Sequence, residues 1–214
     1  MLNNKDLLSI NELSKSEIIS IINNANSYYH DNKISSKKKV LNNFTQINLF
    51  FENSTRTQVS FEIAGTLLGA NVVNFPFSNS SQSKGETLLD LAATLNSMNP
   101  DILIIRHPNS GAVQLISEKV DCPVVNAGDG NHEHPTQALL DILTIKKRIG
   151  RIDNLKIAIC GDIAHSRVAR SNIFCHKKLG NEIRVIGPKT LIPKDIDKLG
   201  VQVFYNMIEG LRDI

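Results

Sequence analysis

The sequence predicts an α/β protein, with a parallel sheet that carries helices on both faces. Short apolar, β-branched segments alternate with segments of helical spacing along the whole chain. The strand candidates are apolar at almost every position, which is typical of parallel strands buried between helices. The length of 214 residues suits one large domain or two small ones.

The first helix is expected at residues 13–29, where Ser14 and Glu17 form a capping-box pattern ahead of apolar residues at helical spacing. Strands are expected at 46–51, 70–75, 101–106, 122–128, 155–162, 182–187 and 201–205. Further helices are expected at 55–69, 87–98, 110–119, 135–150, 166–180, 193–200 and from 206 onward. Cys160 lies in an apolar strand candidate and is therefore expected in the core.

A polar break at residues 148–154 separates a long helix from a fresh strand. We therefore predict a first domain at 1–150 and a second at 151–214.

Composition excludes several classes of protein. The formal net charge is +3, and the basic residues are spread out rather than gathered in a stripe, so no nucleic-acid partner is expected. No secretory leader or membrane-length apolar stretch is visible, so no membrane contact is expected. Three cysteines without disulfide or metal spacing favour the cytoplasm.

Polar and charged side chains follow four of the predicted strands. These segments are Glu52–Thr57, Arg106–Pro108, Asp129–Gln137 and Asp162–Arg167. In open α/β sheets, ligands bind beyond the carboxyl ends of the strands, and we expect all four segments to lie along that edge.

The residue types indicate a multiply anionic small molecule. Cations are Arg56, Arg106, Arg167 and the loop residue Lys84, and neutral hydrogen-bonding groups are Ser54, Thr55, Thr57 and Gln137. The sequence S-T-R-T stands where a helix begins, and the free N–H groups there favour phosphate. Ser54 or Thr55 acting only as a helix cap is the alternative, but a cap does not require Arg56.

His132 and His134 suggest a metal site at first sight, but no third ligand follows at the usual spacing. His134 before Pro135, with Gln137 three residues later, instead presents two neutral groups at one helix start. The sequence also lacks the G-x-G-x-x-G dinucleotide pattern, a P-loop and G-x-S-x-G.

Five motifs in order carry a family resemblance. They are FFENSTRT.VSFE..A..LGA.VV.F, S.SKGETLLD.A..L, RHP.SGA, VNAGDG..EHPTQALLD..TI and GDI.HSRVARSN. Together they resemble the catalytic chains of the aspartate carbamoyltransferase family, from about residue 48 to residue 187. SKGET and HSRVARS favour the aspartate branch over the ornithine branch, because Arg167 suits a dicarboxylate.

The resemblance implies carbamoyl transfer from carbamoyl phosphate to L-aspartate, an early step of pyrimidine synthesis, with no metal, covalent nucleophile or redox cofactor. It implies a complete carbamoyl-phosphate domain and part of a Rossmann-like aspartate domain, because the match ends inside the second domain and members of the family are longer. A half-built sheet is expected to leave an unpaired edge. The open alternatives are a carbamoyltransferase for another acceptor such as ornithine, and an inactive fragment that binds carbamoyl phosphate.

Carried over by position, the resemblance gives each site residue a role. Ser54, Thr55, Arg56 and Thr57 would hold the phosphate; Arg106, His134 and Gln137 the carbamoyl end; Arg167 an aspartate carboxylate. Arg56, Arg106 and His134 would be the catalytic groups. Glu52 would pair with Arg167 across the domains. Ser80 (or Ser81) and Lys84 would enter a neighbouring subunit's site, which implies a homotrimer.

Overall fold

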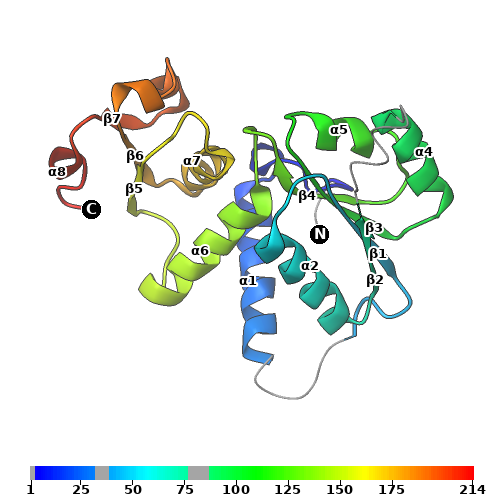
Figure 1. Ribbon diagram of the computed structural model, residues 1–214. Coiled ribbons are helices and arrows are strands. Elements are labelled where there is room, and N and C mark those ends of the chain that lie inside the picture. Colours follow the sequence, from blue (N-terminus) through cyan, green and yellow to red (C-terminus); the bar gives the residue numbers. More distant parts are fainter. Residues whose placement is uncertain (1–2, 32–38, 77–86) are drawn as a thin grey trace. The chain divides into compact units, whose positions relative to one another are not determined.

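The computed structural model describes residues 3–31, 39–76 and 87–214 of the chain (Figure 1). The chain divides into two compact units. The first comprises residues 1–8 and 27–130, and the second comprises residues 9–26 and 131–214. Each unit carries its own parallel sheet.

The first unit contains a four-stranded parallel sheet of order β2-β1-β3-β4. Its strands are β1 (Thr45–Phe50), β2 (Asn71–Pro76), β3 (Ile102–His107) and β4 (Val124–Asp129). Leu7 forms an isolated parallel bridge with Val125 beside β4. Because the strands are parallel, the segments that follow β1, β3 and β4 leave the sheet at the same edge.

Helices cover both faces of this sheet, as the sequence predicts. They are α2 (Thr55–Leu68), α4 (Leu88–Ser97) and α5 (Ala112–Ser117). Ile47, Leu49 and Leu103 pack with α4 and α5 in one apolar cluster. The alternate residues Phe50 and Ile104 face the other way and pack with Phe61 of α2. Alternate side chains along each strand thus point to opposite faces of the sheet, one packed by α4 and α5 and the other by α2.

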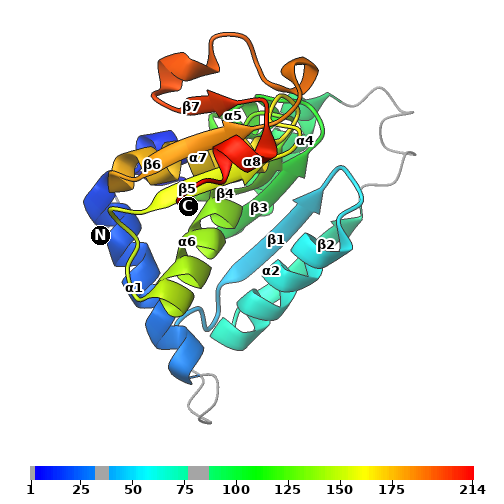
Figure 2. The ribbon, with the colours of Figure 1, turned by 90° about the vertical axis from the view of Figure 1, so that its left-hand side faces the viewer.

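Helix α2 lies close to β1 and β2 (Figure 2). A Cβ on Gly65 would stand 2.4 Å from Oε1 of Gln46, so only glycine allows this approach. The Gln46 amide is buried and donates to Asn48 (2.8 Å) and to the carbonyl of Phe61 (3.0 Å). Gly69 ends the helix in the left-handed conformation at φ +93°. These contacts fix how closely α2 approaches the sheet. They thereby also fix where the N-terminus of α2 lies at the end of the strands.

The second unit contains a three-stranded parallel sheet of order β5-β6-β7. Its strands are β5 (Lys156–Cys160), β6 (Glu182–Ile186) and β7 (Gln202–Phe204). Its helices are α6 (Pro135–Ile149), α7 (Arg167–Leu179) and α8 (Met207–Gly210), with short 3-10 turns η1 (Ile10–Glu12), η2 (Lys189–Leu191) and η3 (Ile196–Leu199). Helix α7 packs on one face through Ala169 and Ile173, and α8 packs near Ile186 on the other.

Helix α1 (Lys15–Asp31) begins in the second unit, and its start confirms the predicted capping box. Ser14 N donates to Glu17 Oε2 at 2.8 Å, and Glu17 N donates to Ser14 Oγ at 3.2 Å. Ile18 and Ile22 form its buried stripe.

Three expectations need correction or qualification. Cys160 is exposed rather than buried, because β5 is an outer strand of its sheet in this structure. The predicted helix at 193–200 is only the 3-10 turn η3. The compact units divide at Gly130 and Asn131, ahead of α6, because α6 packs on α7; the domain boundary at residue 150 stays a prediction.

Among the described residues, no helix combines the length and apolar character needed to cross a membrane.

Candidate functional site

Helix α2 begins a few residues after the carboxyl end of β1. Ser54 occupies the cap position, and within the described residues its side chain makes no capping hydrogen bond. Thr55, Arg56 and Thr57 form the first turn, which contains no acid. The backbone N–H groups of a first turn have no acceptor within the helix, and together with the positive end of the helix dipole they favour an anion at this point.

Arg56 extends from this turn as an exposed cation. No salt bridge joins it to another residue within 3–31, 39–76 or 87–214. Its carbonyl, by contrast, accepts a 2.7 Å hydrogen bond from Ser60 Oγ one turn later. Within the described residues, the guanidinium is thus placed at a helix start without a salt-bridged acid.

Arg106 follows the same edge at the end of β3 and is held by several groups. Its Nε donates to Glu52 Oε1 at 2.6 Å, and its Nη1 lies 3.4 Å from both Thr57 Oγ1 and the carbonyl of Ala127. The Arg106 side chain is only 14% exposed, and that of Glu52 is 27% exposed. A charge-assisted bond of this length fixes the orientation of the guanidinium.

Glu52 has a partner within the first unit that sequence reasoning did not find. The family resemblance implies a pairing with Arg167, which belongs to the second unit, and the structure shows a pairing of Glu52 with Arg106 inside the first unit. Glu52 and Arg106 lie at the same end of the sheet. Arg106 on β3 is the register partner of Phe50 on β1, and Glu52 follows Phe50 by two residues. The pairing of Glu52 with Arg167 stays a prediction.

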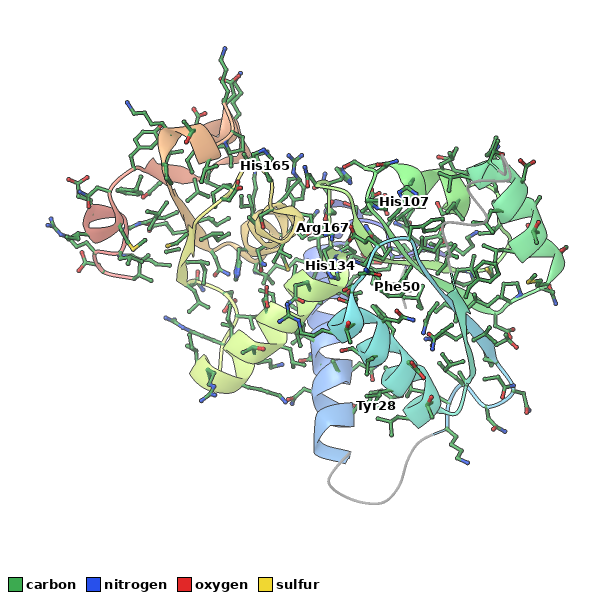
Figure 3. All side chains as sticks on the ribbon, in the orientation of Figure 1. Tyr28, Phe50, His107, His134, His165 and Arg167 are labelled. Atoms are coloured by element: carbon green, nitrogen blue, oxygen red, sulfur yellow. The ribbon has the colours of Figure 1, made fainter. Side chains whose placement is uncertain are left out.

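The ends of β3 and β4 are held by buried polar groups. Both carboxylate oxygens of Asp129 accept from Gly111 N at 3.0 Å. His107 is 4% exposed, its Nδ1 accepts from Asn109 N at 2.9 Å, and its ring lies 4.5 Å from that of Phe51. Burial lowers the pKa of His107. His107, which is labelled in Figure 3, therefore has a structural role at the end of β3.

In the second unit, His134 stands at the start of α6 (Figure 3). It is 6% exposed and occupies the cap position ahead of Pro135. Its backbone N donates to Ser171 Oγ of α7 at 2.8 Å, and its Nδ1 lies 3.4 Å from Thr136 Oγ1. The imidazole is thus placed by contacts from two helices.

Gln137, one turn further along α6, is held by Asp141. Its Nε2 donates to Asp141 Oδ1 at 3.0 Å, and the other carboxylate oxygen accepts from Asn172 Nδ2 of α7 at 2.8 Å. Asp141 thereby fixes the orientation of the Gln137 amide, with Nε2 directed at the carboxylate.

Arg167 is the first residue of α7, directly after the loop that follows β5 (Figure 3). Ser166 caps this helix by accepting from Ala169 N at 3.1 Å. In the same loop the exposed Asp162 accepts from His165 N, which lowers the pKa of Asp162. Arg167 therefore lies at the start of a capped helix in the second unit, in agreement with the helix that the sequence predicts at 166–180.

The structure separates the predicted residues into two sets. Three of the four predicted strand ends belong to one sheet, but the segment at Asp162–Arg167 follows β5 in the other sheet, which corrects the expectation of a single shared edge. Ser54 to Thr57, Glu52 and Arg106 share the first unit, and His134, Gln137 and Arg167 share the second. Ser80 and Lys84 lie outside the described residues.

Sequence reasoning missed the residues that support this site. Ser171 bonds to His134 and to Glu133, and Asn172 bonds to Asp141, which holds Gln137. These bonds from α7 join residues that lie 31 to 38 positions apart in the sequence. Glu133 in H-E-H was the available signal for these contacts, because a buried carboxylate requires hydrogen-bond partners.

Comparisons with known proteins agree on one family. The model described as "Aspartate/ornithine carbamoyltransferase, carbamoyl-P binding domain" matches residues 5–147. The aspartate carbamoyltransferase catalytic subunit of Ruegeria pomeroyi is 56% identical over 211 residues, which cover 98% of this chain and 68% of that subunit. The subunit of Jannaschia sp. is 57% identical over 212 residues, covering 99% and 68% respectively.

Solved structures give the same result. Aspartate transcarbamoylase of Trypanosoma cruzi in complex with carbamoyl phosphate and aspartate superimposes with a TM-score of 0.87 at 34% identity, covering 95% of this chain and 66% of that one. The catalytic subunit of the M. Jannaschii enzyme gives 0.87 at 35% identity, covering 96% and 70%. The chain spans 64% to 68% of the length of the curated relatives it matches.

Proposed function

Because this chain belongs to the aspartate/ornithine carbamoyltransferase family, and to its aspartate branch, we propose that it transfers the carbamoyl group of carbamoyl phosphate to L-aspartate. The products are N-carbamoyl-L-aspartate and phosphate, as in an early step of pyrimidine synthesis. The observation that carries the proposal is the sheet edge of the first unit, where an uncapped helix start, Arg56 and an oriented Arg106 stand together.

The reaction forms a C–N bond and breaks a C–O bond. The aspartate amine attacks the carbamoyl carbon, the phosphate leaves with the electron pair of the C–O bond, and the amine proton passes to the leaving phosphate. Ser54, Thr55, Arg56 and Thr57 bind the phosphate through hydroxyls, backbone N–H groups and one guanidinium. Because phosphate gains negative charge as it leaves, these groups act most strongly in the transition state.

The carbamoyl group needs donors for its oxygen and an acceptor for its NH₂. We assign Arg106 and the imidazole of His134 to the oxygen, whose negative charge grows during attack. Gln137 suits the NH₂, since Asp141 already engages its Nε2 and Oε1 is the acceptor of that amide. Arg167 binds a carboxylate of aspartate, for which a guanidinium has bidentate geometry. Catalysis is then mainly orientation of two reactants.

The assembly and location of the protein belong to the same proposal. Ser80 (or Ser81) and Lys84 serve the site of a neighbouring subunit in a homotrimer. Glu52 also pairs with Arg167 across the two domains of one chain. The location is the cytoplasm, which suits three cysteines that are all free. Sedimentation of the purified protein should give the mass of three chains.

A direct assay tests the proposed reaction. Purified protein is mixed with carbamoyl phosphate and either L-aspartate or L-ornithine, and both phosphate and the carbamoylated amino acid are measured. We expect product with aspartate and none above background with ornithine. Tight calorimetric binding of carbamoyl phosphate without any product from aspartate would contradict the proposal and favour a binding module.

A further inference from the structure

Glu133 is a buried acid for which the proposed reaction has no direct use. It is 1% exposed and stands immediately before His134. Its carboxylate accepts hydrogen bonds from Ser9 Oγ, from Ile10 N at 3.0 Å and from Ser171 Oγ at 3.1 Å. Because a buried carboxylate costs several kcal/mol unless it is well paired, these donors together hold the carboxylate in one orientation.

The hydroxyl of Ser171 joins this carboxylate to His134. Ser171 is fully buried on α7 and donates its single proton to Glu133 Oε2. With the proton engaged there, a lone pair of the same oxygen accepts from His134 N at 2.8 Å. The carboxylate therefore orients the hydroxyl, and the hydroxyl holds the backbone from which the imidazole extends.

The same residue lies on the helix that begins with Arg167. Ser171 is four positions after Arg167 on α7, so both belong to one side of that helix. A shift of α7 along its axis would stretch the bond to His134 N. The path from Glu133 through Ser171 thus fixes the start of α6 against the helix that carries Arg167, within one compact unit.

We propose that Glu133 and Ser171 are positioning residues, which hold His134 in the geometry that the reaction requires. This rests on the proposed function for the role of His134, but not for the contact itself. The predicted consequence is specific: loss of the Ser171 hydroxyl displaces His134 and lowers kcat, while KM for aspartate changes little, because His134 acts on the carbamoyl oxygen.

Two matched variants separate positioning from simple loss of stability. Ser171→Ala and Ser9→Ala each remove one hydroxyl donor from the same carboxylate. The bond from Ser9 reaches Oε1, which has no part in the path to His134, although Ser9 also caps η1 through Asn11 N. We expect Ser171→Ala to lower kcat about 10- to 100-fold, the effect of a small misplacement, and Ser9→Ala to stay within about twofold of the native protein.

A second measurement does not depend on activity. Amide hydrogen exchange at His134 should become faster in Ser171→Ala and remain unchanged in Ser9→Ala, because only the first loses the acceptor of that N–H. Equal exchange at His134 in both variants would overturn the positioning role, even in a protein that transfers no carbamoyl group. A transfer-inactive native protein that shows the expected exchange difference would refute the proposed function alone.

Glu133→Gln provides a further variant should Ser171→Ala not fold. It keeps the shape of the side chain but removes its negative charge, and its one remaining oxygen stays opposite the fixed donor Ile10 N. Ser171 Oγ then donates to a neutral carbonyl in place of a carboxylate and is held less firmly. Faster exchange at His134 is again expected, and unchanged exchange there would contradict the proposal.

Discussion

His176 makes the stability of the second unit depend on pH. It is 2% exposed on α7, and burial lowers its pKa from 6.5 to about 4, with Asp141 opposing part of this effect. The amide of Asn181 is oriented by two contacts, since its Oδ1 accepts from Leu155 N and its Nδ2 donates to the carbonyl of Ile152. That Nδ2 lies 2.8 Å from His176 Nδ1, which must therefore be an unprotonated acceptor.

The sign of the effect follows from the two pKa values. Between pH 6.5 and pH 4 the unfolded chain binds a proton at His176 and the folded chain does not, so the free energy of unfolding falls as pH falls. A difference of about 2.5 pKa units corresponds to about 3 kcal/mol lost over this window. Small domains are typically stable by ~5–15 kcal/mol, so the loss would be large.

Urea denaturation followed by circular dichroism at pH 7 and pH 4 measures this loss. Carboxylates also titrate in that range, so the informative quantity is the difference between the native protein and His176→Gln, which cannot take up the proton. The native protein should lose about 3 kcal/mol more than the variant between the two pH values. Equal losses in the two proteins would refute the assignment of the effect to His176.

Three further predictions concern separate parts of the molecule. Arg56→Ala should cost at least ~3 kcal/mol of transition-state stabilisation in kcat/KM, with Arg56→Lys intermediate, and activity within about tenfold of native would contradict the phosphate role. A thiol reagent should label the exposed Cys160 in the folded protein while the two buried cysteines react only after unfolding, as peptide mass mapping would show. Gly65→Ala should lower the free energy of unfolding by ~1–3 kcal/mol, because its Cβ would meet Gln46 Oε1 at 2.4 Å, and an unchanged urea midpoint would show that α2 moves freely.

Much of the fold could be predicted from local patterns. The capping box at Ser14 and the left-handed glycines after α2, α6 and α7 act within a few residues, so sequence spacing suffices to find them. The strands are apolar and short, and each lies within two or three residues of its expected range. The position of Cys160 depended on which strands flank β5, and no local pattern contains that information.

The site could be predicted in part, for a similar reason. S-T-R-T and H-P-T-Q each carry polar side chains on nearby residues. The end of an apolar strand places the first motif at a helix start, and Pro135 places the second. The hydrogen bonds that hold these groups come from distant residues, such as Ser171 and Asn172 on α7. Packing of α6 against α7 creates these contacts, and no spacing rule connects their positions beforehand.

The surroundings of Arg56 and Arg106 in the first unit support different roles for the two side chains. Arg56 is exposed at the start of α2, and no acid among the described residues forms a salt bridge with it, which suits the proposed binding of a phosphate that is anionic before and after the reaction. Arg106 is 14% exposed and bonded to Glu52, so its charge is largely balanced and its plane is fixed. An oriented but balanced guanidinium gains little from binding a neutral carbonyl and more as negative charge develops on that oxygen. Glu52 therefore suits Arg106 to the carbamoyl oxygen, and the absence of such a partner at Arg56 among the described residues suits that side chain to the phosphate.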